Sequence, residues 1–434
     1  METPPELSTE SLLEFNDVRL AFLSVFPLTV NESITREQAI EILKEKGINT
    51  EWKIPYSKDF KVAEEFLLPR RITDQYFRLK LNDFELSFVK MLQEKPIDIR
   101  LLASVFLTIY PKVGVGVLLF SVRLNHGSVD DLVFLQQSLY GRTKLGIVLS
   151  PPFKEVQKSN ISLEEVAQKH INLILSAFSI PIQNPRILRA RCVEIRSLSD
   201  FKLRDPTELF EKFPNQTYGL LVADEGWRFV PPETAKGRMQ LKWRTRNFLS
   251  VLALAQCVIF VNFQEKETYT QYQASQKQIR EKYGHEVEEY FTYSPEIAGL
   301  NHGPLFMLEN ASVQRFIIEQ TEEQIIETPL KSIKEILISR EKLLDVLSRL
   351  SCIKIPEIGL LGQNVQDAMR VSKGIEESEK KLEEVERTLL IRYNQRINLG
   401  IVILTVVSLG VGILSILIDM GLLNLLLNII ANSS

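Results

Sequence analysis

Six polar or small residues recur along an apolar segment near the C-terminal end of the sequence. Residues 397–418 contain no Asp, Glu, Lys or Arg. Six polar or small residues lie within this segment or directly after it: Asn398, Thr405, Ser408, Gly412, Ser415 and Asp419. Successive members are 7, 3, 4, 3 and 4 residues apart. An α-helix has 3.6 residues per turn, so these intervals place all six on one face. Lipid cannot hydrogen-bond to hydroxyl or amide groups, and we therefore expect this stripe to face protein or water.

The stripe predicts contact between copies of the chain, because one chain supplies only one such helix. The simplest arrangement is a homo-oligomeric bundle in which the six residues are pore-lining. Alternatively, the small and hydroxyl residues only mediate tight helix packing, with Ser and Thr bonding back to the carbonyl four residues earlier. Asp419 is either an interfacial cap or one member of a carboxylate ring at a pore mouth, which would favour cations.

A basic segment that contains tryptophan is the second candidate site. It follows the sequence Asp224-Glu-Gly-Trp-Arg228, and its predicted ligand-binding residues are Arg238, Lys242, Trp243, Arg244 and Arg246. Guanidinium groups and an indole ring suit a phosphate and a stacked base, which makes a nucleotide the expected ligand. The alternative is a solvated basic surface, since clustered charges usually lie on the surface.

The familiar patterns of catalytic and zinc sites are missing from the sequence. None of the four histidines belongs to a His-Glu-x-x-His motif or neighbours a cysteine pair, and neither a phosphate-binding loop nor a Gly-x-Ser-x-Gly motif is present. We therefore expect no enzymatic activity. The remaining candidate ligands for a divalent cation such as Mg²⁺ are glutamates before the apolar segment: Glu376, Glu377, Glu379, Glu383, Glu384 and Glu386. The lysines between them favour a solvated coiled-coil surface instead.

The composition indicates a globular protein with one membrane segment. Lys and Arg number 52 and Asp and Glu number 55, and this net charge of −3 gives no reason to expect direct DNA binding. Three cysteines exclude a disulfide scaffold. A helix over residues 397–418 would be about 33 Å long, enough for a hydrocarbon core of about 30 Å. Basic residues precede this segment and none follows it, which predicts an inner (plasma) membrane protein with residues 1–396 in the cytoplasm. The N-terminal sequence is acidic and has no basic region followed by an apolar run, so we expect no signal peptide.

Strands that alternate with helices predict an α+β or α/β domain over residues 17–265, after a flexible N-terminus at residues 1–16. Strands are expected at residues 17–30, 71–81, 98–110, 113–124, 186–198, 218–224 and 257–263. Capping sequences that begin at Thr35, Ser128 and Ser162 predict the starts of three helices.

Residues 266–396 are expected to form a helical region that ends in a coiled-coil-like stalk. Its predicted seam recurs every three or four residues, at Ala368, Val371, Ile375, Ser378, Leu382, Val385 and Leu389. We expect one helix from residue 363 to 418, of which residues 397–418 cross the membrane. The apolar residues 419–434 are too few for an ordinary second crossing, so they lie at the interface, re-enter partway or cross a thinned bilayer.

This layout resembles the CorA family of divalent-cation channels, in which a cytoplasmic α/β domain is followed by a long helix that enters the membrane. The resemblance implies a homopentamer whose transmembrane helices line a cation pore. The family's Gly-Met-Asn motif is replaced here by Asp419-Met420-Gly421, which puts selection of hydrated Mg²⁺ in question. CorA-like proteins without the motif also serve as membrane effectors of CRISPR-type antiviral defence, opened by a nucleotide messenger. A scaffold that is merely anchored by its C-terminal helix is the alternative outside this family.

Overall fold

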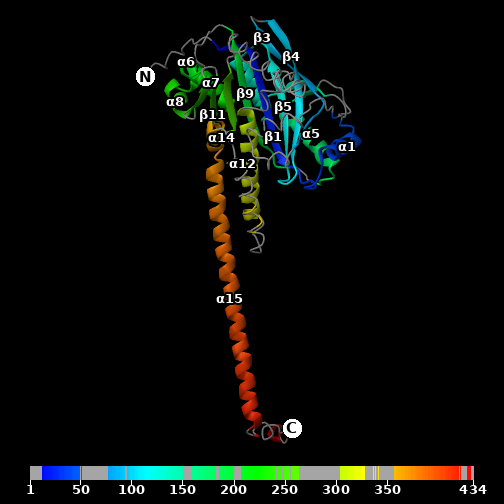
Figure 1. Ribbon diagram of the computed structural model, residues 1–434, viewed down its shortest axis with the longest axis vertical. Coiled ribbons are helices and arrows are strands. Elements are labelled where there is room, and N and C mark those ends of the chain that lie inside the picture. The colour runs from blue at the N-terminus through cyan, green and yellow to red at the C-terminus, as the bar shows by residue number, and fades with distance from the viewer. Residues whose placement is uncertain are drawn as a thin grey trace, which may run out of the picture. The chain divides into compact units, whose positions relative to one another are not determined.

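The computed structural model describes residues 12–48, 50, 77–92, 95–149, 159–181, 185–199, 207–239, 242–246, 249–254, 256–262, 304–327, 336, 338, 341, 356–419, 421 and 428–431 (Figure 1). The chain divides into two units. Residues 1–320 and 342–375 form the first unit, and residues 321–341 and 376–434 form the second.

The first unit is built on a mixed sheet, and its described residues include 12 strands. These are β1 (Glu14–Pro27), β2 (Phe77–Lys80), β3 (Phe84–Leu92), β4 (Lys95–Tyr110), β5 (Val115–Leu124), β6 (Gly127–Ser128), β7 (Leu145–Val148), β8 (Ser159–Ile161), β9 (Leu188–Leu198), β10 (Lys242–Arg246), β11 (Leu249–Leu254) and β12 (Cys257–Asn262). Their order is β10-β11-β12-β9-β1-β5-β4-β3-β7-β8, with β2 paired to β4 and β6 paired to β1. Only the β12–β9 pairing is parallel among the described strands.

The described helices of the chain are α1 (Arg36–Glu45), α4 (Val129–Ser138), α5 (Leu163–Ala177), α6 (Thr207–Lys212), α7 (Pro214–Val222), the 3₁₀ helix η1 (Glu225–Phe229), α8 (Pro232–Arg238), α12 (Pro304–Glu327), α14 (Pro356–Ala368) and α15 (Val371–Asp419). Among the described helices, the two longest are α12 and α15, with 24 and 49 residues. This α/β domain followed by a long apolar helix confirms the predicted fold class.

Successive side chains along a strand point to opposite faces of the sheet, and both faces are buried at the central strands. On β4, Leu107 and Ile109 belong to the core cluster that also contains residues of α4 and α5. Thr108 and Tyr110 point to the opposite face, where the Tyr110 hydroxyl contacts Glu309 of α12. Helices therefore cover both faces of the central strands, as expected for a sheet whose strands are apolar on both sides.

Three helix starts follow the predicted capping chemistry. The Thr35 hydroxyl accepts the backbone N–H of Gln38, and the Gln38 side chain accepts the N–H of Thr35. Ser128 and Asp131 form the same reciprocal pair at α4. Ser162 accepts the N–H of Glu165 at α5. Each side chain satisfies a backbone donor that the first helical turn leaves unpaired.

The strand predicted at residues 218–224 is wrong, because these residues belong mostly to α7. Pro214 occupies the first turn of this helix, where its missing N–H costs nothing. Every residue from Pro214 to Leu221 is buried. A helix that is buried on all sides has no apolar stripe, so its sequence resembles that of a buried strand.

Other predicted boundaries shift by a few residues. β1 begins at Glu14, inside the segment expected to be flexible, and Leu13 and Phe15 are buried in the core. Strand β2 accounts for residues 77–80 of the strand predicted at 71–81, and residues 71–76 lie outside the described residues. The domain boundary predicted at residue 265 also lies outside them.

The single helix predicted over residues 363–418 is interrupted near its start. Helix α14 ends at Ala368, and α15 begins at Val371. Arg370 between them has a φ of +55°, a left-handed conformation that ends α14. Gly374 then lies against α12, because a Cβ there would come within 3.0 Å of Ile318 Cγ2.

Four of the seven residues of the predicted seam are buried, and the other three, Ala368, Val385 and Leu389, are partly exposed. Val371 and Ile375 are buried in the first unit, and Ser378 and Leu382 are buried in the second. In the second unit, Lys381 Nζ donates to Glu322 Oε1 of α12 over 2.9 Å. The last turns of α12 and the early turns of α15 are thus linked within this unit.

Candidate functional site

The apolar half of α15 is the clearest functional feature of the described chain. Every residue from 391 to 416 is exposed, including Leu404 with 69% of its surface accessible. α15 is long and apolar enough to cross a membrane, and none of its most apolar 18-residue window is buried. A core helix of a soluble protein would be mostly buried, and a signal sequence would lie near the N-terminus. α15 is therefore a candidate C-terminal membrane-anchoring helix that follows a soluble α/β domain.

The predicted stripe lies on this helix. Because α15 is continuously helical to Asp419, all six residues occupy one face. All six are exposed: Asn398, Thr405, Ser408, Gly412, Ser415 and Asp419. A Cβ added at Gly412 would meet no atom within 4 Å. The face is open to a partner along its whole length, and its pore-lining role stays a prediction.

The hydroxyl of Thr405 donates to the carbonyl of Ile401 over 2.7 Å. This is the back-bonded geometry that makes Thr tolerable in an apolar helix. Within the described residues, the side chains of Asn398, Ser408 and Ser415 have no hydrogen-bond partner. Three members of the stripe therefore need a partner that a single chain in lipid does not provide.

The end of α15 depends on glycine. Gly421 has a φ of +66°, and its N–H donates to the carbonyl of Ile418 over 2.9 Å. This left-handed residue closes the helix just after Asp419. Residues 428–431 are helical, and residues 422–427 lie outside the described residues. The three arrangements predicted for residues 419–434 therefore stay open.

The predicted ligand-binding segment is partly described. Lys242, Trp243, Arg244 and Arg246 belong to the edge strand β10, and their side chains lie outside the described part of the structure. Arg238, the last residue of α8, donates from Nη1 to the Tyr218 hydroxyl over 2.7 Å. Its guanidinium carbon lies 5.6 Å from the centre of the Tyr218 ring. Arg238 thus binds α7, and the structure does not describe it together with the other four side chains.

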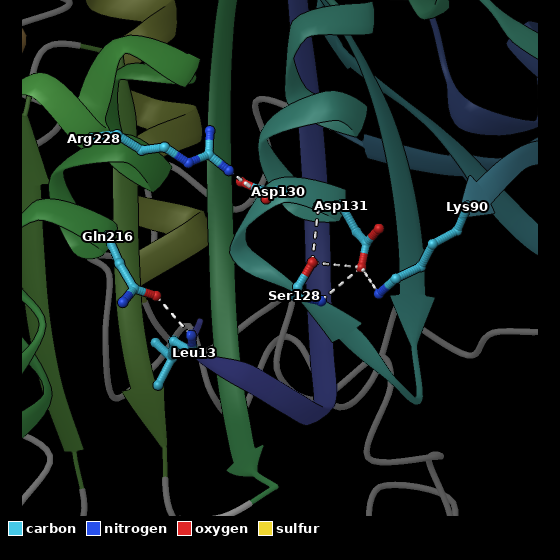
Figure 2. Close-up of polar contacts among 7 residues, drawn as sticks. All are labelled: Leu13, Lys90, Ser128, Asp130, Asp131, Gln216 and Arg228. Atoms are coloured by element: carbon cyan, nitrogen blue, oxygen red, sulfur yellow. Dashed lines mark hydrogen bonds and ion pairs between the residues drawn. The ribbon is translucent and has the colours of Figure 1, made fainter. Parts of the chain in front are cut away.

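The residues before α8 make contacts that stabilise the fold. The Asp224 carboxylate accepts the N–H of Gly226 over 2.9 Å and caps η1. Trp227 is buried, whereas Arg228 extends towards α4 and pairs with Asp130 over 2.5 Å (Figure 2). Both members of this ion pair are more than one-third exposed, so its contribution to stability is small.

A second polar group at the start of α4 also maintains the fold (Figure 2). Asp131 Oδ2 accepts from the N–H and the hydroxyl of Ser128, at 2.7 and 2.8 Å, and from Lys90 Nζ at 2.6 Å. These bonds hold α4 to β3. Similarly, Gln216 Oε1 of α7 accepts the N–H of Leu13 over 2.7 Å and secures the start of β1. These side chains are occupied by the protein's own donors.

The stalk glutamates are partly paired with lysines. Glu376 accepts from Lys380 over 2.6 Å, and this hydrogen bond is the main cause of the raised pKa of Lys380. Within the described residues, no group of three His, Cys, Asp or Glu side chains is arranged to hold a metal ion.

No known protein family, curated protein or solved structure matches this chain. The function therefore rests on the residues themselves.

One group of charges was missed by the sequence-based interpretation. Arg142, Arg189 and Arg191 all act electrostatically on Tyr140, and Arg191 is almost completely buried. A signal was available, since Leu188-Arg-Ala-Arg191 places two cations on the same face of the strand as Val193 and Ile195. Their approach to Tyr140, about 50 residues earlier in the sequence, depends on the tertiary structure.

Proposed function

We propose that this protein is a homo-oligomeric membrane channel whose pore is formed by copies of α15. Residues 1–396 would lie in the cytoplasm and α15 would cross the inner (plasma) membrane. The observation that carries this proposal is the stripe of polar residues along one exposed face of an apolar helix. A helix that only anchors a domain has no need of such a face.

Three side chains of the stripe lack partners within the described chain. Bringing copies of α15 together around this face would place Asn398, Ser408 and Ser415 against one another or against water. Either arrangement satisfies groups that are costly to expose to lipid. Asp419 would then contribute a ring of carboxylates at one end of the pore, which favours cations such as Mg²⁺.

The α/β domain would supply the gate. The CorA-like layout supports this assignment, since it places a cytoplasmic domain directly before the membrane helix. A ligand or cation shifts such a gate only if it binds the open and closed states with different affinities. A pentamer is the expected assembly by the same resemblance.

Ion flux in liposomes tests the proposal. We expect cation flux from the reconstituted protein, and we expect Thr405→Leu and Ser408→Leu to abolish it by making the pore apolar. The control is Val406→Leu, which changes an exposed residue on a different face of α15. Flux that persists in both stripe variants, or a detergent-solubilised protein with the mass of a monomer, would contradict a pore.

A membrane-anchored scaffold is the second candidate. The observation in its favour is the bond from Thr405 to the Ile401 carbonyl, which satisfies one stripe hydroxyl within a single helix. Replacing residues 397–434 with a polyleucine anchor separates the two functions. A scaffold would keep its activity in cells, whereas a channel would lose it.

A nucleotide-messenger-activated effector of antiviral defence is a specialised form of the channel. Its support is the CorA-like layout without the Gly-Met-Asn motif, together with the basic segment that ends in β10. We expect growth arrest that requires the messenger pathway and is lost in Arg244→Ala or Arg246→Ala. Arrest without the messenger would leave the channel proposal intact and exclude this form of it.

A further inference from the structure

We infer that Tyr140, Arg142, Arg189 and Arg191 form a binding site for a small phosphate-bearing molecule. The site lies in the α/β domain, away from the segment at residues 238–246, and it does not depend on ion conduction by α15.

The fold brings these residues together at the first half of β9. Arg189 and Arg191 are two positions apart on β9 and share the face that is covered by α4 and α7. Tyr140 and Arg142 follow the C-terminus of α4, with Gly141 between them at a φ of +71°. This left-handed glycine turns the chain so that residues on both sides of it approach β9.

Arg191 forms the floor of the site. It is 4% exposed, one of its Nη groups donates to the carbonyl of Leu221, and its guanidinium carbon lies 5.2 Å from the centre of the Tyr140 ring. Its side chain also contacts the Cys257 thiol, but its Nε has no hydrogen-bond acceptor, and no carboxylate forms an ion pair with it among the described residues. A buried cation is normally paired, because removing a charge from water is costly.

Arg189 and Arg142 form the rim. Arg189 pairs with Glu164 over 2.5 Å, and the two side chains are 24% and 35% exposed. Its Nε also lacks an acceptor within the described chain. Arg142 is exposed, and it has no carboxylate partner among the described residues. Burial raises the pKa of the Tyr140 phenol, while the charges of Arg191, Arg189 and Arg142 each oppose this rise.

The charges of the group do not balance. Three guanidinium groups face one carboxylate, so the excess is 3 − 1 = +2. The C-terminus of α7, which accepts from Arg191, contributes a negative partial charge of only about half an elementary charge. Helix capping therefore accounts for part of the arrangement and leaves most of the positive charge uncompensated.

A phosphate group would balance this surplus of positive charge. A phosphate monoester is close to a dianion at neutral pH, and its oxygens accept the parallel N–H groups of a guanidinium. The Tyr140 hydroxyl adds a neutral donor, and its ring is already stacked with Arg191. Because Arg142 and Arg189 are accessible while Arg191 is almost fully buried, the site suits a compact phosphate or diphosphate that approaches from the rim.

Calorimetric titration of the full-length protein in detergent tests this site, with pyrophosphate and ADP as separate probes. We expect pyrophosphate to bind, and we expect Arg142→Ala to weaken its binding by about tenfold through loss of one charged contact. Glu164→Gln should tighten binding, because it removes the carboxylate that competes for Arg189. The matched control is Arg100→Ala, since Arg100 is also exposed and its nearest partner is Asp98.

Both affected positions are partly or fully exposed, so these variants should fold. Tighter binding of ADP than of pyrophosphate would extend the site to a nucleoside diphosphate, whereas equal affinities would assign it to the phosphates alone. The inference is overturned if neither probe binds the wild-type protein, or if Arg142→Ala and Glu164→Gln leave the affinity unchanged. None of these results depends on flux through α15.

Discussion

Arg78 of β2 forms a buried ion pair with Glu309 of α12, and their side chains are 6% and 1% exposed. Two further bonds complete the network. Arg78 Nε donates to the Thr108 hydroxyl over 2.9 Å, and the Tyr110 hydroxyl donates to Glu309 Oε1 over 3.1 Å. Burial, and secondly the Glu309 carboxylate, raise the pKa of Tyr110 well above its usual value. Through these four side chains, α12 is held to the face of the sheet opposite α4 and α5.

Removing one charge from this pair should loosen α12. Glu309→Gln leaves the Arg78 guanidinium buried without its counter-ion, which typically costs about 3–5 kcal/mol. We expect faster amide hydrogen exchange in β2 and α12 of the full-length protein. The double variant Arg78→Met/Glu309→Leu removes both charges and should restore most of the protection. An equal loss of protection from hydrogen exchange in the single and double variants would show that packing, and not charge, holds α12 to the sheet.

His170 should make the domain sensitive to mild acid. Its ring is buried between Phe84 and Phe120, and its Nδ1 donates to the carbonyl of Val166 over 2.9 Å. Burial lowers the pKa of His170 to about 4 from an ordinary 6.5. Between pH 6.5 and pH 4, His170 is therefore protonated in the unfolded chain but neutral in the folded chain. The free energy of unfolding consequently falls as the pH decreases from 6.5 towards 4.

Denaturant unfolding at pH 7 and at pH 5 measures this effect. At most about 1.4 kcal/mol is lost per pH unit from one group. In His170→Leu, the contribution of this group disappears, and the slope of stability between the two pH values should decrease, by less than this maximum. An unchanged slope would mean that other groups cause the acid sensitivity.

Gly219 of α7 should be intolerant of a side chain. A Cβ at this position would lie 2.5 Å from Cδ1 and Cγ of Trp227, which is buried. We expect Gly219→Ala to destabilise the domain by about 1–3 kcal/mol through overpacking, measured by thermal unfolding. Gly237→Ala in α8 is the control, because a Cβ there meets no atom within 4 Å. That variant should be neutral or slightly stabilising.

Leu382 and Leu390 provide a matched test of the stalk seam. Both lie on α15, but Leu382 is fully buried in the second unit and Leu390 is 42% exposed. Leu382→Ala should destabilise this unit by about 2–5 kcal/mol, and hydrogen exchange should rise around residues 378–389. Leu390→Ala should have little effect in a monomer. A comparable effect of Leu390→Ala that depends on protein concentration would place this residue at a contact between copies.

Much of the local structure could be predicted because its causes are local. The three helix caps depend on side chains within three residues of one another, and the apolar span depends on one uninterrupted run. The buried part of the seam, from Val371 to Leu382, was also predictable, since its spacing follows directly from the helical period. The prediction of one continuous helix failed at Arg370, whose left-handed conformation separates α14 from α15.

The sequence by itself therefore determined the caps, the main strands, the apolar helix and the polar stripe, because each arises from residue types at short, regular spacing. Only the tertiary structure decided that Tyr218 lies in a buried helix, that Arg78 meets Glu309, and that Arg191 meets Tyr140. The last two pairs are separated by 231 and 51 residues, the second being 191 − 140. Such contacts are set by strand order and helix packing, which no local pattern of residues encodes.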